Sequence, residues 1–178
     1  MAARAPITTP RLTLRPPRAE DARAIFAEIS CDPEVTRYVG WARHESIAQT
    51  LEFLAFSSRE WERWPAGPLL ILSREDGAIL GTTGLAFETP HRASTGYVLA
   101  RKAWGQGIAS EALRAVAALA DTLAVRRLHA LVHTAHSASA RVLDRCGFKR
   151  EGVLESYQVF PNLGTAEPQD VFCYSRVR

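Results

Sequence analysis

Two glycines at the start of a predicted helix are the residues whose spacing most clearly points to chemistry. In "KAWGQGIASEAL" (residues 102–113), Gly105 and Gly107 stand between an apolar run and a segment with helical spacing. Unpaired backbone N–H groups at a helix start, together with the helix dipole, bind phosphate. Glycine lets that backbone approach an anion closely and take a positive φ. The stretch is consistent with a phosphate-binding turn, and spacing alone fits equally well with a turn that only packs helix against strand.

Two well-known phosphate loops do not match this stretch. A Walker loop requires G-x-x-x-x-G-K-[ST], which is absent. A dinucleotide-binding fingerprint requires a third glycine where this chain has Ser110, and an acidic residue that ends a second strand. Asp121 instead falls at the close of the predicted helix. The turn is therefore neither a Walker loop nor a Rossmann fingerprint.

The elements that must position this turn form a predicted mixed sheet with helices. Apolar alternation and apolar runs bounded by turn residues predict seven strands, and helical spacing predicts four helices. The predicted strands cover 11–15, a hairpin over 69–87 with its turn at Asp76-Gly77, 94–100, 126–133, 152–160 and 169–177. The predicted helices cover 20–30, 45–61, 105–119 and 137–148. Because the two kinds of element do not alternate regularly, an α+β (mixed α/β) fold is expected.

Composition and charge limit the class of protein. With 178 residues, of which 47% are hydrophobic and 23% charged, the chain is expected to form one globular domain over 1–178. The net charge of +3 is mild, and no basic run with interleaved aromatics stands out, so nucleic acid is not an expected partner. Three scattered cysteines (Cys31, Cys146 and Cys173) argue against a disulfide framework and a zinc site.

The same sequence gives an expectation about location. The start of the chain, "MAARAPITTPRLTLR", has no apolar segment typical of a secretory signal. No apolar run approaches the roughly 20 residues that a membrane span needs. We therefore expect a cytoplasmic protein with no membrane partner.

Five segments of the chain resemble one known family. "KAWGQGIASEAL" is similar to the coenzyme A pyrophosphate loop of the GNAT acetyltransferases, Gln/Arg-x-x-Gly-x-Gly/Ala, with Lys102 as a conservative departure. The chain resembles the RimJ/RimL-like branch of N-acetyltransferases in "TPRLTLRPPRAEDA", "DPEVTRYVGW", "GYVLARKAWGQGIASEAL", "HSASARVLDRCGFKREGVL" and "QDVFCYS". Because the five segments follow one another in the family's order over nearly the whole chain, the resemblance is specific.

The resemblance implies a fold and a cofactor. The GNAT fold has a central, mostly antiparallel, twisted sheet of about seven strands, splayed at the cofactor site and flanked by about four helices. Acetyl-CoA would lie in the splay between strands 94–100 and 126–133, with backbone groups of Val98, Leu99 and Ala100 along the pantetheine arm. The resemblance assigns the rest of the coenzyme site to Lys102, Gly105, Gln106, Gly107, Ile108, Ala109, Ser110, His136 and Ser139.

The resemblance also implies direct attack of an amine on the thioester, which needs a neutral amine, an oxyanion donor and a proton for the leaving thiolate. Ser139 matches the family's serine that contacts the coenzyme and is a candidate proton donor, or else a serine that bonds local backbone. His136 stands where the family usually has asparagine. Ser94 stands where the family often has a glutamate base, so Glu88, His91, His133 or a water molecule is left as the candidate base.

The acceptor is the least defined part of the expected site. The resemblance places Trp41 in the acceptor pocket, with Tyr97 and Asp170 as further candidates, and each has an ordinary structural role as its alternative. The expected function is acetyl-CoA-dependent acetylation of a primary amine, such as a peptide N-terminus. A coenzyme A-binding module without catalysis, or an acetyltransferase for a small amine, stays open. A homodimer is a further possible assembly.

Overall fold

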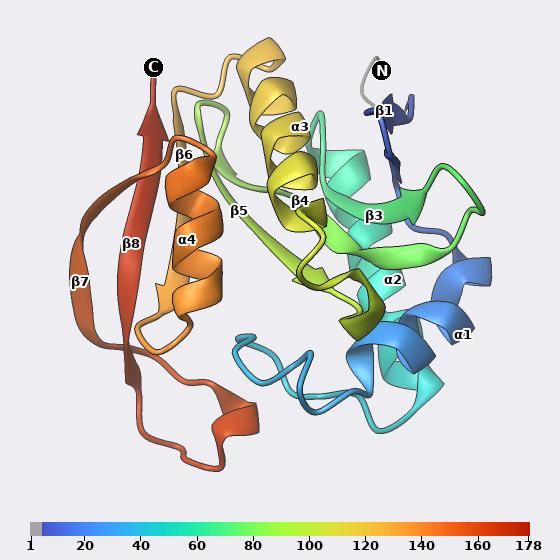
Figure 1. Ribbon diagram of the computed structural model, residues 1–178, viewed down its shortest axis with the longest axis horizontal. Helices are drawn as coiled ribbons and strands as arrows, with labels where there is room; N and C mark the ends of the chain where they lie inside the picture. The colour runs from blue at the N-terminus through green and yellow to red at the C-terminus, as the bar shows by residue number, and fades with distance from the viewer. Residues whose placement is uncertain (1–4) are drawn as a thin grey trace.

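Eight strands of the computed structural model form one twisted sheet in the order β1-β2-β3-β4-β5-β6-β8-β7 (Figure 1). The structure describes residues 5–178. Residues 1–4, which belong to the segment where we expect no secretory signal, lie outside the described residues. Among the described residues, only β5 and β6 pair in parallel, and the other neighbouring pairs are antiparallel. The strands are β1 (Ile7–Thr8), β2 (Leu12–Arg15), β3 (Pro68–Ser73), β4 (Ile79–Thr89), β5 (Arg92–Leu99), β6 (Arg127–His133), β7 (Lys149–Gln158) and β8 (Gln169–Val177).

The predicted mixed, mostly antiparallel sheet is confirmed, with one strand more than the seven expected. The additional strand is β1, which has two residues and pairs Ile7 with Leu14. Two residues are too few to show an alternating pattern in the sequence. This strand is therefore recognised only from its pairing with β2.

Four helices flank the sheet, as expected. They are α1 (Ala22–Ile25), α2 (Ile47–Arg63), α3 (Ile108–Thr122) and α4 (Ser137–Arg145). A 3₁₀ turn at Ala19–Asp21 and a π-helical turn at Phe26–Ser30 extend α1 at its two ends. The predicted helix over 20–30 is therefore a continuous segment of 3₁₀, α and π helix in succession. In residues 5–178, no helix has the length and apolar character needed to cross a membrane.

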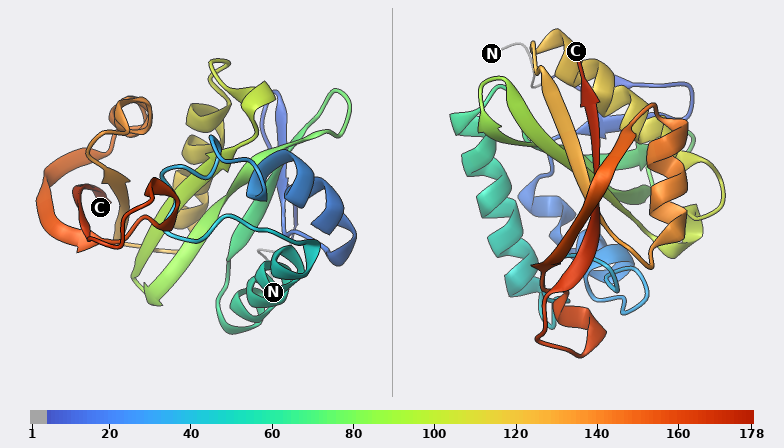
Figure 2. Two further views of the ribbon diagram at one scale, coloured as in Figure 1. Left: turned by 90° about the horizontal axis from the view of Figure 1, so that it is seen from below. Right: turned by 90° about the vertical axis from the view of Figure 1, so that its left-hand side faces the viewer.

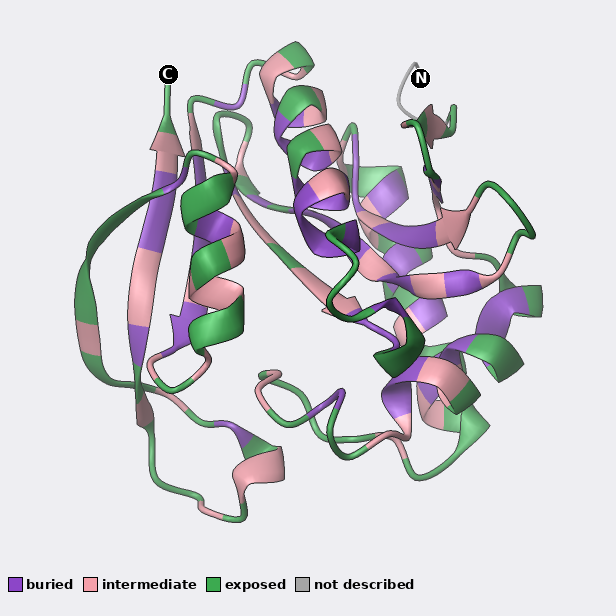
Figure 3. Cartoon of the chain, in the orientation of Figure 1, coloured by how far each residue is buried: buried purple, intermediate pink, exposed green. Residues whose placement is uncertain are grey.

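The helices form two layers, one on each face of the sheet (Figure 2). Leu69 and Ile71 of β3 are buried in the cluster that contains α3, whereas Leu70 between them is buried with residues of α1 and α2. This follows from the period of two along a strand, which sends successive side chains to opposite faces. Figure 3 shows the result: buried residues line the inner side of α3, and β7 at the open edge is almost wholly exposed.

The parallel pair β5–β6 is short. Its register joins only Arg92–Ser94 to Arg127–His129, although both strands continue beyond that point. On the side toward β6, residues 95–99 of β5 pair with no strand in the described part of the chain. The sheet is therefore splayed at the place that the resemblance predicts.

We expect the core to depend on buried leucines more than on exposed ones of the same size. Leu70→Ala removes a side chain that is 0% exposed and leaves a cavity between the sheet and α1 and α2. It should lower the free energy of unfolding by about 2–5 kcal/mol. Leu51→Ala, at a helix position that is 45% exposed, should change it by less than about 1 kcal/mol. Urea denaturation of the two variants measures both values, and equal losses would contradict the assignment of the core.

Candidate active site

The glycine turn before α3 has the backbone conformation that its sequence predicts. Gly105 and Gly107 have φ values of 74° and 76°, in the left-handed region that side chains other than glycine rarely adopt. A Cβ atom at Gly105 would meet nothing within 4 Å, and one at Gly107 would meet only a terminal nitrogen of Arg11 at 3.6 Å. Close packing of protein atoms therefore does not explain either glycine. The turn leaves room above the first N–H groups of α3, which have no partner within the helix.

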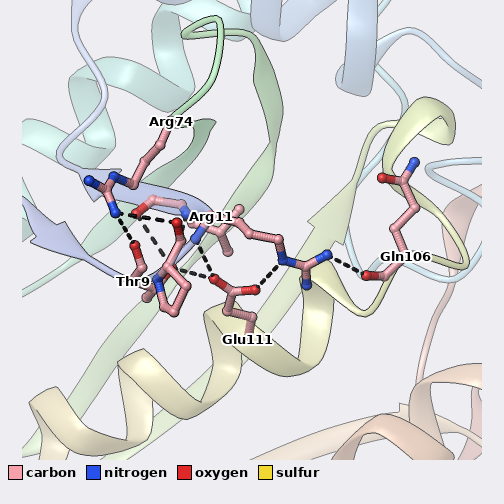
Figure 4. Close-up of polar contacts among 7 residues, drawn as sticks. Thr9, Arg11, Arg74, Gln106 and Glu111 are labelled. Carbon is pink, nitrogen blue, oxygen red and sulfur yellow. Dashed lines mark hydrogen bonds and ion pairs between the residues drawn. The ribbon is translucent and has the colours of Figure 1, made fainter.

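A network of polar side chains holds the turn in place (Figure 4). The Arg11 side chain donates to the Gln106 carbonyl oxygen at 2.9 Å and to Glu111 Oε2 at 2.7 Å. Glu111 Oε1 accepts the Thr9 hydroxyl at 2.6 Å and the Arg11 backbone N–H at 3.0 Å. Partial burial opposes ionisation of Glu111, but these hydrogen bonds outweigh it and lower its pKa. The network ties the start of β2 to the first turn of α3.

A cavity of about 450 Å³ opens where β5 and β6 diverge. Its wall comes from residues 95–99 of β5, residues 130–133 of β6, the start of α3, helix α4 and the loop 34–39. Among the predicted site residues, the wall contains Tyr97, Val98, Leu99, Gly105, Ala109, His133, His136 and Ser139. Other predicted residues, within the described chain, lie outside the wall: Trp41, Glu88, Ala100, Lys102, Gln106, Gly107, Ile108, Ser110 and Asp170.

Two hydroxyl groups meet in the cavity wall. The Tyr97 phenol oxygen lies 2.9 Å from Ser139 Oγ and 3.3 Å from the Ser139 carbonyl oxygen. The Ser139 hydroxyl therefore bonds across the site, from α4 to β5. The alternative role for this serine, a hydrogen bond to the local backbone, is not what the structure shows. Burial raises the pKa of Tyr97 to about 12, although its bond to Ser139 opposes this, so the phenol keeps its proton at neutral pH. Sequence reasoning assigned Tyr97 to the acceptor pocket and did not foresee this contact.

An aromatic group lies near the end of β6. Tyr38 stacks on His136 with ring centroids 4.8 Å apart, and it lies 5.0 Å from the ring of His133. Phe160 meets His133 edge-on at 4.8 Å. Burial lowers the pKa of both histidines, so both rings are neutral near pH 7. Neither Tyr38 nor Phe160 was singled out from the sequence, because an isolated aromatic carries no positional signal.

One asparagine joins the two loops beside this aromatic group. Asn162 donates to the carbonyl oxygens of Thr36 at 2.7 Å and Trp41 at 2.9 Å, and its own oxygen accepts the Arg43 N–H at 2.9 Å. Asn162 follows β7, whereas the other three residues belong to the loop between α1 and α2. The side chain therefore holds together two loops that lie more than a hundred residues apart in sequence. Trp41 itself is 37% exposed and packs against His44.

Three of the predicted residues make contacts elsewhere. Glu88, at the end of β4, pairs with Arg92 at 2.6 Å and with His129 Nε2 at 3.1 Å. Asp170 accepts the Ser156 N–H at 2.8 Å and so ties β8 to β7. Lys102 lies 3.0 Å from Glu28. The Glu88–His129 pair was missed, because a contact between strands β4 and β6 across β5 depends on their register and not on any local spacing.

Comparison with known proteins identifies the family of this chain. The family described as "Acetyltransferase (GNAT) domain" matches residues 11–149. The "Uncharacterized N-acetyltransferase YoaA" of Bacillus subtilis (strain 168) is 37% identical over 180 residues, which cover 97% of this chain and 96% of the relative. The chain therefore belongs to the GNAT acetyltransferases, a family of acyltransferases.

Solved structures agree on the fold. RimL, a "Ribosomal L7/L12 alpha-N-protein acetyltransferase" solved in complex with coenzyme A, is similar with a TM-score of 0.86 and 21% identity, over 97% of this chain and 98% of that one. A GNAT-family acetyltransferase from Bacillus anthracis is similar with a TM-score of 0.83 and 21% identity, over 97% and 98% of the two chains. The predicted family and fold are confirmed, and acetyl-CoA is the acyl donor that this family uses. The residues assigned to its site stay predictions.

We expect acetyl-CoA binding to depend on the backbone of the turn. Gln106→Ala should leave the affinity within a few-fold, because the Gln106 side chain turns back to the Lys102 carbonyl oxygen at 2.6 Å. Gly107→Val should weaken binding about tenfold or more, because a β-branched residue resists the φ of 76°. Isothermal titration calorimetry with acetyl-CoA measures both. Equal effects of the two substitutions would contradict a backbone-built phosphate site.

Proposed function

We propose that this chain transfers the acetyl group of acetyl-CoA to a primary amine, with the α-amine of a peptide or protein as its preferred acceptor. The observation that carries the proposal is the Tyr97–Ser139 hydroxyl pair, which lies in one cavity with the unpaired side of β5 and the glycine turn. Acetyl transfer from coenzyme A needs three such parts. The unpaired side of β5 offers a place for the extended pantetheine arm, the glycine turn offers a place for the diphosphate, and the hydroxyl pair is a proton donor.

The residues present fit coenzyme A. The unpaired backbone of β5 up to Val98 and Leu99 can accept an extended pantetheine arm as an added strand would. The Leu99 carbonyl oxygen already accepts the Trp104 indole N–H at 2.8 Å, and a carbonyl oxygen has a second lone pair for another donor. The N–H groups from Gly105 to Ser110, at the positive end of the α3 dipole, would hold the diphosphate.

The Tyr97–Ser139 pair supplies the proton that the reaction needs. Acetyl-CoA, when bound, supplies an acyl group activated as a thioester. As the amine nitrogen bonds to the acyl carbon and the carbon–sulfur bond breaks, Ser139 would give its proton to the departing sulfur. Tyr97, which burial keeps protonated, can pass a proton to the serine through their 2.9 Å contact, and the proton that the amine loses would restore the phenol. The amine must lose a proton as well. Glu88 and His91 lie outside the cavity wall, and the lone pair of His133 is taken by the Ala135 N–H, so water is the candidate base.

Two features favour an α-amine as the acceptor. A peptide α-amine with a pKa near 8 is neutral in about one molecule in ten at pH 7, whereas a lysine amine with a pKa near 10.4 is neutral in fewer than about one in a thousand. A site without a strong base therefore favours the α-amine by about 10²-fold. In addition, RimL, a structural neighbour, is named as an α-N-protein acetyltransferase.

Ser139→Ala should lower kcat by about 10²–10⁴-fold with little change in acetyl-CoA affinity, because it removes the proton donor and leaves the coenzyme site. Ser137→Ala is the matched control: Ser137 is exposed, lies in the same turn of α4, and its hydroxyl accepts a hydrogen bond from Arg141. It should leave kcat within about twofold. Stopped-flow measurement of thiol release separates chemistry from product release. An unchanged rate of the chemical step in Ser139→Ala would show that this serine is not the proton donor and has a structural role.

The acceptor preference has its own test. At pH 7, kcat/KM for a short peptide with a free N-terminus should exceed that for the same peptide with a blocked N-terminus and one lysine by about 10²-fold. The rate should rise with pH through the pKa of the acceptor amine, because only the neutral amine attacks. Mass spectrometry of the products identifies the acetylated nitrogen. Efficient acetylation of the blocked peptide at neutral pH would contradict the preference and point to a strong base.

A further inference from the structure

His133 carries a hydrogen-bond donor that no described residue accepts. It is the last residue of β6, is 8% exposed and forms part of the cavity wall. Its Nδ1 accepts the backbone N–H of Ala135 at 3.0 Å, so this nitrogen carries no proton. In a neutral imidazole the other nitrogen is then the N–H donor. That nitrogen, Nε2, is buried and has no hydrogen-bond partner in the described chain.

The ring is a better donor than base in this arrangement. Burial lowers the pKa of His133, although the charge of Asp170 opposes this, so the ring is neutral near pH 7. A base must offer a lone pair, and the single lone pair of this neutral tautomer is already taken by the Ala135 N–H. Accepting a proton from an amine would break that bond. The group that His133 offers to a ligand is therefore the Nε2–H.

Within residues 5–178, the surroundings of His133 supply no acceptor for this N–H. The rings of Tyr38 and Phe160 pack against it at 5.0 Å and 4.8 Å, one from each of the two loops that Asn162 joins. A buried donor without a partner is rare in native proteins and calls for an explanation. Tyr38 and His133 both form part of the cavity wall, so a molecule bound in the cavity lies beside this ring.

We propose that His133 Nε2–H donates a hydrogen bond to a carbonyl oxygen of the acceptor, and thereby selects amines with a carbonyl group on the adjacent carbon. This inference rests on the proposed function and names the class of acceptor: peptides and amino-acid amides, and not alkylamines or polyamines. In such a molecule the amine nitrogen and the carbonyl carbon are bonded to the same carbon atom. A single hydrogen bond at the carbonyl oxygen therefore also orients the amine. An acceptor without that oxygen leaves the buried N–H unpaired, which is costly.

The test compares two acceptors on three proteins. Alaninamide has the carbonyl group, and 3-methylbutan-2-amine has nearly the same shape without it. His133→Phe removes the donor, and His133→Gln keeps an N–H group but offers no base. For each acceptor, kcat/KM of the variant is divided by that of the unaltered protein, so the pKa of the amine cancels.

For His133→Phe, we expect kcat/KM to fall about 10–100-fold with alaninamide and to change less than about threefold with the alkylamine. His133→Gln should recover most of the loss with alaninamide. If His133 were the base, both acceptors would fall equally in both variants, and the proposal would be overturned. Calorimetry with acetyl-CoA shows that each variant is folded and binds the donor.

A second measurement does not depend on turnover. In the unaltered protein, ¹⁵N NMR of the histidine side chains should show His133 as the Nε2–H tautomer, and its Nε2–H resonance should shift when alaninamide is added in the presence of coenzyme A. The alkylamine should leave it in place. A shift without acetylation of either amine would contradict the proposed function and still support the donor. No shift with an active enzyme would overturn the donor alone.

Discussion

Parallel pairing between β5 and β6 lasts for only three residues, and the candidate site depends on the divergence that follows. Two parallel neighbours cannot be joined by a tight turn, so the chain must cross over between them, here through α3. The crossover begins next to the end of β5, and this brings the glycine turn and the positive end of α3 to the mouth of the gap. One topological constraint thus brings the unpaired side of β5 and the glycine turn together.

The chemistry of the site depends on the cavity between the diverging strands β5 and β6. The cavity is lined mainly by apolar groups, so the few polar groups in it act in a medium that screens them weakly. Burial keeps the Tyr97 phenol protonated and the rings of His133 and His136 neutral. The part of the wall that β5, β6 and α4 form thus holds hydroxyl and N–H donors in place of charges, which suits a reaction in which negative charge develops on oxygen and sulfur.

In our proposal, the loops beside His133 select the acceptor. The solved neighbours share this fold at about one-fifth identity, and a shared fold does not define a substrate. The residues that differ most readily among such proteins lie on connecting segments, where Tyr38, Asn162 and Phe160 are found. Because Asn162 bonds to three backbone groups of the opposite loop, the two loops act as one wall. The orphaned Nε2–H of His133 lies against that wall.

Local features of the chain could be predicted because they depend on neighbouring residues. The helical spacing of α3, the alternation in β2 and the left-handed glycines at 105 and 107 are of this kind. Contacts that depend on strand register or on the crossover could not be predicted. The Tyr97–Ser139 bond joins residues 42 positions apart, and the bond of Asn162 to Thr36 spans 126 positions. The sequence by itself determined the family, the glycine turn and most elements. Only the tertiary structure decided which side chains meet, because no local pattern encodes how distant segments pack.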